Sequence, residues 1–133
     1  MLAPAAINMQ IQPSYEDTVQ DIMDFFVEKL QAVKRAGITD VILDPGFGFG
    51  KTLKQNYQIL QQLDTFRIFD LPLLAGMSRK SMICKLLKVN PSKALNGTTA
   101  VNVIALQKGA TILRVHDVKE GMEVIKIVDG FLN

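Results

Sequence analysis

Three times along this chain, a short apolar run is followed by a polar turn and then by a segment with helical periodicity. The apolar runs cover residues 41–43, 71–75 and 111–115. Alternation of short apolar runs with helical patterns predicts βα units and a parallel sheet. Because the carboxyl ends of parallel strands meet at one edge, the polar residues after the three runs should gather there. The sequence therefore predicts an α/β fold made of one helix followed by three βα units.

The helices are predicted from apolar spacing and from their end signals. The first covers residues 14–36, where Ser14 and Asp17 resemble a capping box at its start and Gly37 is expected to end it. Further helices are expected at 54–63, at 98–108 with Thr98 or Thr99 as its cap, and at 118–132. The last helix has an apolar stripe at four positions: Met122, Ile125, Val128 and Leu132.

The composition favours one globular domain over residues 1–133 and excludes several classes of protein. The chain is 48% hydrophobic with a net charge of +2, which gives no reason to expect a nucleic-acid or membrane partner. A single cysteine, Cys84, allows no internal disulfide, so we expect a cytoplasmic protein. Residues 1–7 lack the pattern of a signal peptide. Residues 1–8 are interpreted as an added extension, a frayed tail or the remnant of a longer chain.

The first polar turn is the run LDPGFGFGK at residues 43–51. Asp44 ends an apolar strand, where an unpaired carboxylate would be costly to bury. Gly46 and Gly48 allow a ligand to approach the backbone closely, and two phenylalanines between the glycines are expected to expose aromatic faces. The pattern favours a floor for a flat, polar heterocycle. The alternative is a glycine-rich turn that joins strand and helix without a ligand.

Two familiar nucleotide-binding loops are excluded by spacing. A P-loop requires glycine five residues before Gly50, where the chain has Pro45. A dinucleotide-binding fingerprint that starts at Gly46 would require glycine at position 51, where the chain has Lys51.

The other two turns carry positive charge. The run GMSRKS at 76–81 places two cations at the start of a helix, where an anion is favoured, so the cations suggest a bound anion. A solvated basic turn is the alternative. In the run RVHD at 114–117, Arg114 and His116 are two residues apart and would share one face of a strand.

Together, in this order and spacing, these three runs resemble dihydropteroate synthases from about residue 9 to the C-terminus. The resemblance implies a TIM (β/α)8 barrel, of which this chain would be the C-terminal part with strands six, seven and eight. Residues 1–7 do not match the usual fifth strand. The implied reaction is a transferase reaction of folate biosynthesis, the target of sulfonamides. It joins 6-hydroxymethyl-7,8-dihydropterin pyrophosphate to 4-aminobenzoate and releases pyrophosphate.

The resemblance also assigns roles to site residues. It implies catalytic roles for Asp44, Lys80 and Arg114. Eight residues are implied to bind substrate: Asp44 and Lys80 at the pterin, Gly76 beneath its ring, Gly48, Phe49 and Ser81 around the aminobenzoate, and Arg114 and His116 at the pyrophosphate. Arg79 is expected in a structural ion pair.

The chain is shorter than the roughly 250 residues of such a barrel, so we expect only half a site. The family implies Mg²⁺, but its asparagine ligand has no counterpart, and no metal ligand is expected in this chain. By itself the chain is expected to be inactive and to associate as a homodimer or with the missing barrel half. The alternatives are a pterin-binding methyltransferase that works with a corrinoid, a module that binds pterin or an anion without turnover, and a folded fragment without ligand affinity.

Overall fold

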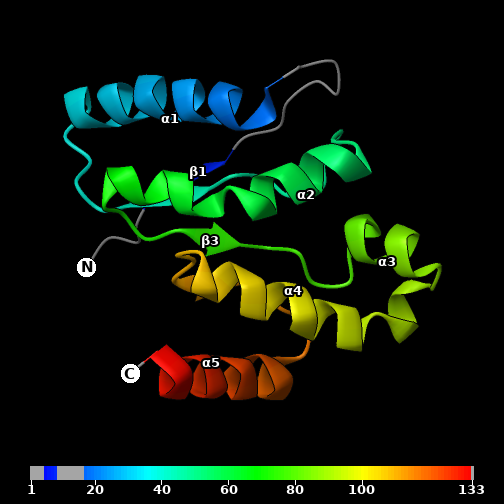
Figure 1. Ribbon diagram of the computed structural model, residues 1–133. Helices are drawn as coiled ribbons and strands as arrows, with labels where there is room; N and C mark the ends of the chain where they lie inside the picture. Colours follow the sequence, from blue (N-terminus) through cyan, green and yellow to red (C-terminus); the bar gives the residue numbers. More distant parts are fainter. Residues whose placement is uncertain (1–4, 9–16, 133) are drawn as a thin grey trace.

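The computed structural model describes residues 5–8 and 17–132 and shows a row of parallel strands with helices stacked beside it (Figure 1). The helices and strands follow in the order β1 (Ala5–Asn8), α1 (Thr18–Arg35), β2 (Val41–Asp44), α2 (Leu53–Gln61), β3 (Leu74–Ala75), α3 (Ser81–Leu87), α4 (Leu95–Gln107), β4 (Ile112–Leu113) and α5 (Val118–Leu132), with 3-10 turns at Leu63–Phe69 and Pro91–Lys93. Strands β1 and β2 pair in parallel, as do β3 and β4, and a parallel bridge between Leu43 and Leu73 joins the two pairs. This arrangement confirms the predicted α/β fold with parallel strands.

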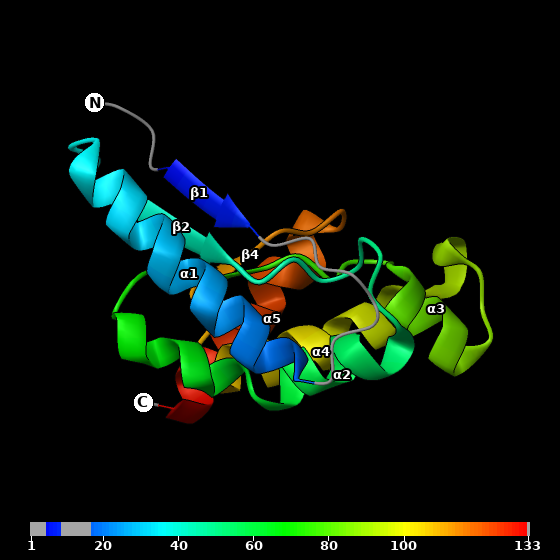
Figure 2. The ribbon, with the colours of Figure 1, turned by 90° about the horizontal axis from the view of Figure 1, so that it is seen from above.

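Strand β1 was not predicted, and the expectation of only three strands is wrong. Its register places Ala5 beside Val41 and Ile7 beside Leu43, and Figure 2 shows β1 and β2 side by side with their arrowheads at the same end. Two alanines give this segment little intrinsic strand preference, so pairing with β2 decides its conformation. The predicted match at residues 9–16 lies outside the described residues.

Strands β3 and β4 are shorter than the apolar runs that predicted them. Each has two paired residues. Strand β3 begins late because the chain is turned before it by Asp70, whose φ is +52°, and by Pro72, which has no N–H to donate. The hydroxyl of Thr111 accepts a hydrogen bond from the Leu73 N–H at 3.0 Å and so links the starts of the two strands.

Helix α1 begins later than predicted. Asp17 is the N-cap, and its carboxylate accepts a hydrogen bond from Gln20 N–H at 3.0 Å, so the helix starts at Thr18. Ser14 lies outside the described residues. Gly37, with φ +79°, confirms the predicted stop. The helix buries Phe26 against the edges of Phe66 and Phe69, at ring distances of 5.5 and 5.9 Å.

Helices α4 and α5 correct two further predictions. Helix α4 starts at Leu95 and not at Thr98, whose hydroxyl donates to the Ala94 carbonyl and accepts from Arg79 N–H. The bounds of α5 are as predicted, but its buried face carries Val124 and Val128, whereas Met122 and Leu132 of the predicted stripe are exposed. The predicted buried face differs from the observed one because apolar residues cover more than half of the circumference of α5, so their spacing does not single out one face.

Candidate functional site

Asp44 is the only carboxylate among the predicted site residues, and the fold buries it. It is the last residue of β2, and it is 5% exposed. One carboxylate oxygen, Oδ1, accepts a hydrogen bond from Gly46 N–H at 2.8 Å, and the other, Oδ2, lies 3.6 Å from Nη1 of Arg114. Asp44 therefore presents a negative charge at the carboxyl end of the strand, beside a cation from the end of β4.

The glycine loop follows Asp44 and depends on left-handed backbone. Gly46, Gly48 and Gly50 have φ values of +77°, +95° and +71°, which side chains other than glycine adopt only at a cost. Of the two phenylalanines expected to expose aromatic faces, Phe47 is buried in the core and only Phe49 is exposed, at 59%. The prediction was wrong for Phe47 because Gly48, with its positive φ, turns the backbone between the two phenylalanines, so that Phe47 packs into the core while Phe49 faces outward.

Lys80 reaches this loop from the next strand end. It is the N-cap residue of α3, and its ammonium donates a hydrogen bond to the Phe47 carbonyl at 2.8 Å. The same ammonium lies 5.2 Å from the centre of the Phe49 ring, within the range of a cation–π interaction. Burial lowers the pKa of Lys80, and the nearby Arg114 lowers it further, while Asp44 acts in the opposite direction.

Lys51 is a third cation at the loop. Its ammonium donates to the Gly46 carbonyl. Burial lowers its pKa to about 8, with Asp44 raising it and Lys80 lowering it. Lys51, Lys80 and Arg114 thus share a site with one carboxylate, Asp44, and the excess positive charge favours an anionic ligand.

The residues that follow β4 lie beside those that follow β3. The β3–β4 pairing matches Ala75 with Leu113, so Gly76 comes opposite Arg114 and Ser78 opposite His116. A Cβ atom on Gly76 would lie 2.5 Å from Nη2 of Arg114, so this guanidinium rests on the bare backbone of Gly76. The Ser78 hydroxyl lies 2.8 Å from Nδ1 of His116 and also accepts a hydrogen bond from His116 N–H.

Arg79 and Asp117 form the expected structural ion pair. Two guanidinium nitrogens of Arg79 bind the two carboxylate oxygens of Asp117, each at 3.0 Å. The guanidinium lowers the pKa of Asp117, and the carboxylate raises the pKa of Arg79. This pair ties the turn after β3 to the turn after β4.

The predicted site residues are mostly brought together. Contacts connect six of them in two groups, Asp44 with Gly76 and Arg114, and Gly48 with Phe49 and Lys80, and the charge of Lys80 interacts with the charges of Asp44 and Arg114. His116 joins through Ser78 and the strand pairing. Ser81 is exposed at the first position of α3, and in the described part of the chain no hydrogen bond or ion pair connects it to the others.

Sequence reasoning missed one residue that holds the loop. Asn56 is 1% exposed, and its amide oxygen accepts a hydrogen bond from Gly48 N–H at 2.8 Å. A signal was present, because Asn56 precedes Ile59, Leu60 and Leu63 by three, four and seven residues and so occupies the apolar face of α2. A polar residue on a buried helix face requires a partner.

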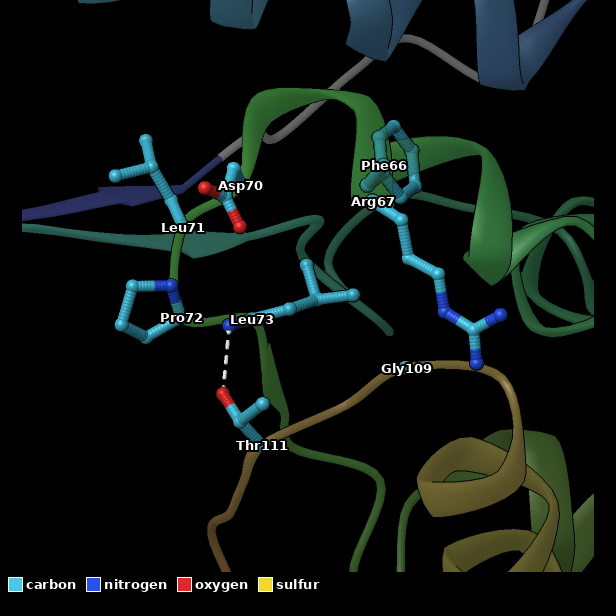
Figure 3. A pocket seen from close by; sticks show the side chains of 8 residues that line it. All are labelled: Phe66, Arg67, Asp70, Leu71, Pro72, Leu73, Gly109 and Thr111. Carbon is cyan, nitrogen blue, oxygen red and sulfur yellow. Dashed lines mark hydrogen bonds between the residues drawn. The ribbon is translucent and has the colours of Figure 1, made fainter.

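Two cavities lie away from the strand ends that carry the cluster. One, of about 490 Å³, opens at the amino ends of β3 and β4, where Phe66, Arg67 and Asp70 face Leu73, Gly109 and Thr111 (Figure 3). The other, of about 230 Å³, lies between α4 and α5 and is lined by Val103, Val124, Ile127 and neighbouring side chains. Ligands of parallel α/β folds bind at the carboxyl ends of the strands, so we place the candidate site at the cationic cluster and not in these cavities.

Two further features were sought among the described residues, a metal-binding group and a membrane-spanning helix. They include no group of three His, Cys, Asp or Glu side chains able to hold a metal ion. Within residues 5–8 and 17–132, no helix has the length and apolar character needed to cross a membrane.

Comparison with known proteins gives concordant results. A family model described as "Pterin binding enzyme" matches residues 3–116. The chain is 49% identical over 127 residues to dihydropteroate synthase of Escherichia coli K12, covering 94% of this chain and 45% of that protein. It is 35% identical over 122 residues to dihydropteroate synthase of Bacillus subtilis, covering 90% of this chain and 43% of the relative.

Solved structures agree on the fold. The Yersinia pestis enzyme in complex with a pterine-sulfa conjugate superposes with a TM-score of 0.93 at 47% identity, over 96% of this chain and 51% of that one. The Xanthomonas albilineans dihydropteroate synthase with 4-aminobenzoic acid gives a TM-score of 0.93 at 34% identity, over 97% and 49% of the two chains. The chain thus spans about half the length of the proteins it matches.

Proposed function

Because this chain belongs to the pterin binding enzyme family, we propose that it forms part of a dihydropteroate synthase. The proposed reaction joins 6-hydroxymethyl-7,8-dihydropterin pyrophosphate to 4-aminobenzoate and releases pyrophosphate. The observation that carries the proposal is the group of charges at the strand ends, where Arg114 lies 3.6 Å from the buried carboxylate of Asp44 and the charges of Lys51 and Lys80 also interact with this carboxylate. A site of this kind suits a substrate with a polar ring and an anionic leaving group.

The proposed pterin subsite uses Asp44, Lys80 and Gly76. A carboxylate can accept two hydrogen bonds from a guanidine-like edge, so Asp44 would hold that edge of the pterin. The Arg114 guanidinium lies 3.6 Å from Asp44 and covers Gly76. A pterin at Asp44 and Gly76 would therefore displace this guanidinium toward the pyrophosphate.

The proposed leaving-group subsite uses Arg114 and His116. When the carbon–oxygen bond to pyrophosphate breaks, negative charge develops on the departing oxygens and positive charge on the pterin. Arg114 and His116 would stabilise the former, and Asp44 the latter, through preorganised charges. No side chain needs to act as a nucleophile.

The aminobenzoate subsite is proposed at Gly48, Phe49 and Ser81. Phe49 exposes its ring beside Lys80, so an aromatic amine could lie against the ring while the ammonium fixes its other edge. Ser81 is exposed next to Lys80 and would receive the carboxylate.

The remaining parts of the enzyme are proposed to come from outside this chain. Since the chain spans 45% of the Escherichia coli relative, we propose that a further segment or chain completes the barrel and that the assembled enzyme is a cytoplasmic homodimer. The described residues hold no group of three acidic, histidine or cysteine side chains suited to a metal ion, and we propose that the Mg²⁺ ligand of the enzyme belongs to the completing segment. We expect the 133-residue chain by itself to be inactive.

A chimeric barrel tests the proposal. In it, this chain replaces the matching part of the Escherichia coli relative, and dihydropteroate formation is measured. We expect turnover, and we expect Lys80→Ala or Arg114→Ala to reduce kcat/KM by about 10²- to 10³-fold, the scale of losing one group that stabilises developing charge. Lys126→Ala and Arg35→Ala are matched controls, since they remove cations from exposed positions on α5 and α1.

Near-normal turnover in the Lys80 and Arg114 variants would refute the assigned roles. A folded chimera that neither turns over nor binds a dihydropterin pyrophosphate analogue in calorimetry would refute the proposed function.

A further inference from the structure

One peptide group in the glycine loop is held from both sides. The N–H of the Phe47–Gly48 peptide donates to Oδ1 of Asn56 at 2.8 Å, and the carbonyl of the same peptide accepts from the Lys80 ammonium at 2.8 Å. Asn56 is on α2 and Lys80 is the N-cap of α3, so two separate helices fix one peptide plane.

The orientation of Asn56 is itself fixed. Its side chain is 1% exposed, and its Nδ2 donates to the Thr52 carbonyl at 3.1 Å while Oδ1 accepts from Gly48. Both ends of the amide are therefore used. Rotating the amide by 180° would place a donor against Gly48 N–H, which a buried site disfavours.

A peptide that precedes a glycine with positive φ is prone to flip. The main turn types differ by such a rotation, and Gly48, at φ +95°, has no Cβ to oppose it. A flipped Phe47–Gly48 peptide would turn its N–H toward the Lys80 ammonium and its carbonyl toward Oδ1 of Asn56. Both contacts would be repulsive, so Asn56 stabilises the one orientation in which the carbonyl faces Lys80.

The Lys80 side chain lies along this part of the loop. A Cβ atom on Gly48 would lie 3.4 Å from Cδ of Lys80, and the ammonium is 5.2 Å from the Phe49 ring centre. The position of the ammonium therefore depends on the loop backbone, and the loop backbone depends on Asn56.

We propose that Asn56 is a positioning residue that sets the place of the Lys80 ammonium through the Phe47–Gly48 peptide. The inference rests on the proposed function insofar as Lys80 contacts the substrates. Asn56 itself is buried behind the loop and touches no substrate in this scheme.

The variants separate the hydrogen bond from the volume of the side chain. Asn56→Leu keeps the volume and removes the acceptor. The Thr52 carbonyl still receives the Asn56 backbone N–H at 3.0 Å, so the unpaired group is Gly48 N–H. Asn56→Asp keeps an oxygen for Gly48. Asn102→Leu is the matched control, since Asn102 is 2% exposed on α4 and its Oδ1 accepts no hydrogen bond from the described residues.

The first readout needs no substrate. In the chimeric barrel, NMR of labelled glycine and lysine follows Gly48 amide exchange and the Lys80 Cε signal. We expect Asn56→Leu to accelerate Gly48 exchange by about 10-fold or more and to shift the Lys80 signal, as loss of a buried hydrogen bond predicts. Asn56→Asp should preserve Gly48 protection, because an oxygen still accepts from Gly48 N–H, and Asn102→Leu should preserve both signals. An unchanged Lys80 signal in Asn56→Leu, or a displaced one in Asn102→Leu, would overturn the proposal.

The second readout is a double-mutant cycle on kcat/KM. We expect Asn56→Leu to reduce it by about 10- to 100-fold, the scale of a displaced reacting group. In a Lys80→Met background the same change should cost less than about 2-fold, because both residues act through one ammonium. Losses that multiply would overturn the proposal. A chimera without any turnover or pterin binding would refute the proposed function, whereas the NMR readout would still test the role of Asn56.

Discussion

Gly76→Ala should separate the function of the site from the stability of the fold. The added Cβ would lie 2.5, 2.9 and 3.0 Å from Nη2, Cζ and Nε of Arg114. Ordinary contact between such atoms requires about 3.5 Å or more, so the guanidinium must move by about 1 Å. Gly76 does not have a positive φ, so the substitution adds no backbone strain.

The cost to stability should be small, because the group that moves is the end of a flexible side chain. The Arg114 side chain is 55% exposed, and its contact with Asp44 is an ion pair at 3.6 Å. Asp44 is buried but keeps its hydrogen bond from Gly46 N–H, and the arginine side of the pair is screened by solvent, so loosening the pair should cost no more than about 1 kcal/mol. We therefore expect the free energy of urea unfolding of the chimeric barrel to change by less than about 1 kcal/mol. Gly130→Ala on α5, with no atom within 4 Å of its Cβ, is the control and should be neutral or stabilising.

The cost to catalysis should be larger. A displacement of about 1 Å in a group that stabilises the leaving pyrophosphate can reduce kcat/KM by about 100-fold, equivalent to about 2.7 kcal/mol. Steady-state kinetics with both substrates measures this loss. The reasoning would be refuted by wild-type kcat/KM, or by an unfolding free energy lowered by more than about 2 kcal/mol, which would mean that the methyl group meets the core and not Arg114.

Three further outcomes follow from the same structure. Lys51, with its pKa lowered to about 8, should lose its charge as pH rises through that value. Pyrophosphate affinity measured by calorimetry should therefore fall around this pH, and Lys51→Met should remove this pH dependence. Because the pKa of Lys51 in the folded state lies below its ordinary value, the free energy of unfolding should also rise with pH between about pH 8 and 10.5. Asp117→Asn should lower the melting temperature at pH 7. Because Arg79 depresses the pKa of Asp117, the difference in melting temperature from wild type should shrink as pH falls below about 3.8 and through the pKa of the folded state. A difference in melting temperature that persists in acid would contradict the ion-pair explanation. Gly97→Ala should destabilise by about 1–3 kcal/mol in urea unfolding, since its Cβ would lie 2.5 Å from Cγ2 of buried Ile83, and an unchanged midpoint would show that α3 can shift freely.

Features that depend on neighbouring residues in the chain could be predicted from the sequence. Helix α5 has the predicted bounds, and Gly37 ends α1 as predicted, because helix ends depend on neighbouring residues. The apolar stripe of α1, with Val19, Ile22 and Phe26 buried, follows from its 3.6-residue period.

Other features depend on contacts between distant segments and were predicted wrongly or missed. Strand β1 exists because Ala5 and Ile7 find Val41 and Leu43 beside them, some 36 residues along the chain. Phe47 is buried while Phe49 is exposed, because the Phe47 side chain packs into the core beneath the loop. The start of α4 at Leu95 involves Thr98, whose hydroxyl accepts from the backbone of Arg79.

The sequence by itself determined the parallel α/β class, the family and the strand ends at which the chemistry is placed, because these depend on periodicity and on short runs of residues. Only the tertiary structure decided how these residues meet: Arg114 against Gly76 and Asp44, and Lys80 and Asn56 on opposite sides of one peptide. Each of these contacts joins residues from different strands or helices. The physical reason is that a local pattern fixes where a side chain starts, whereas strand register and helix packing fix what it reaches.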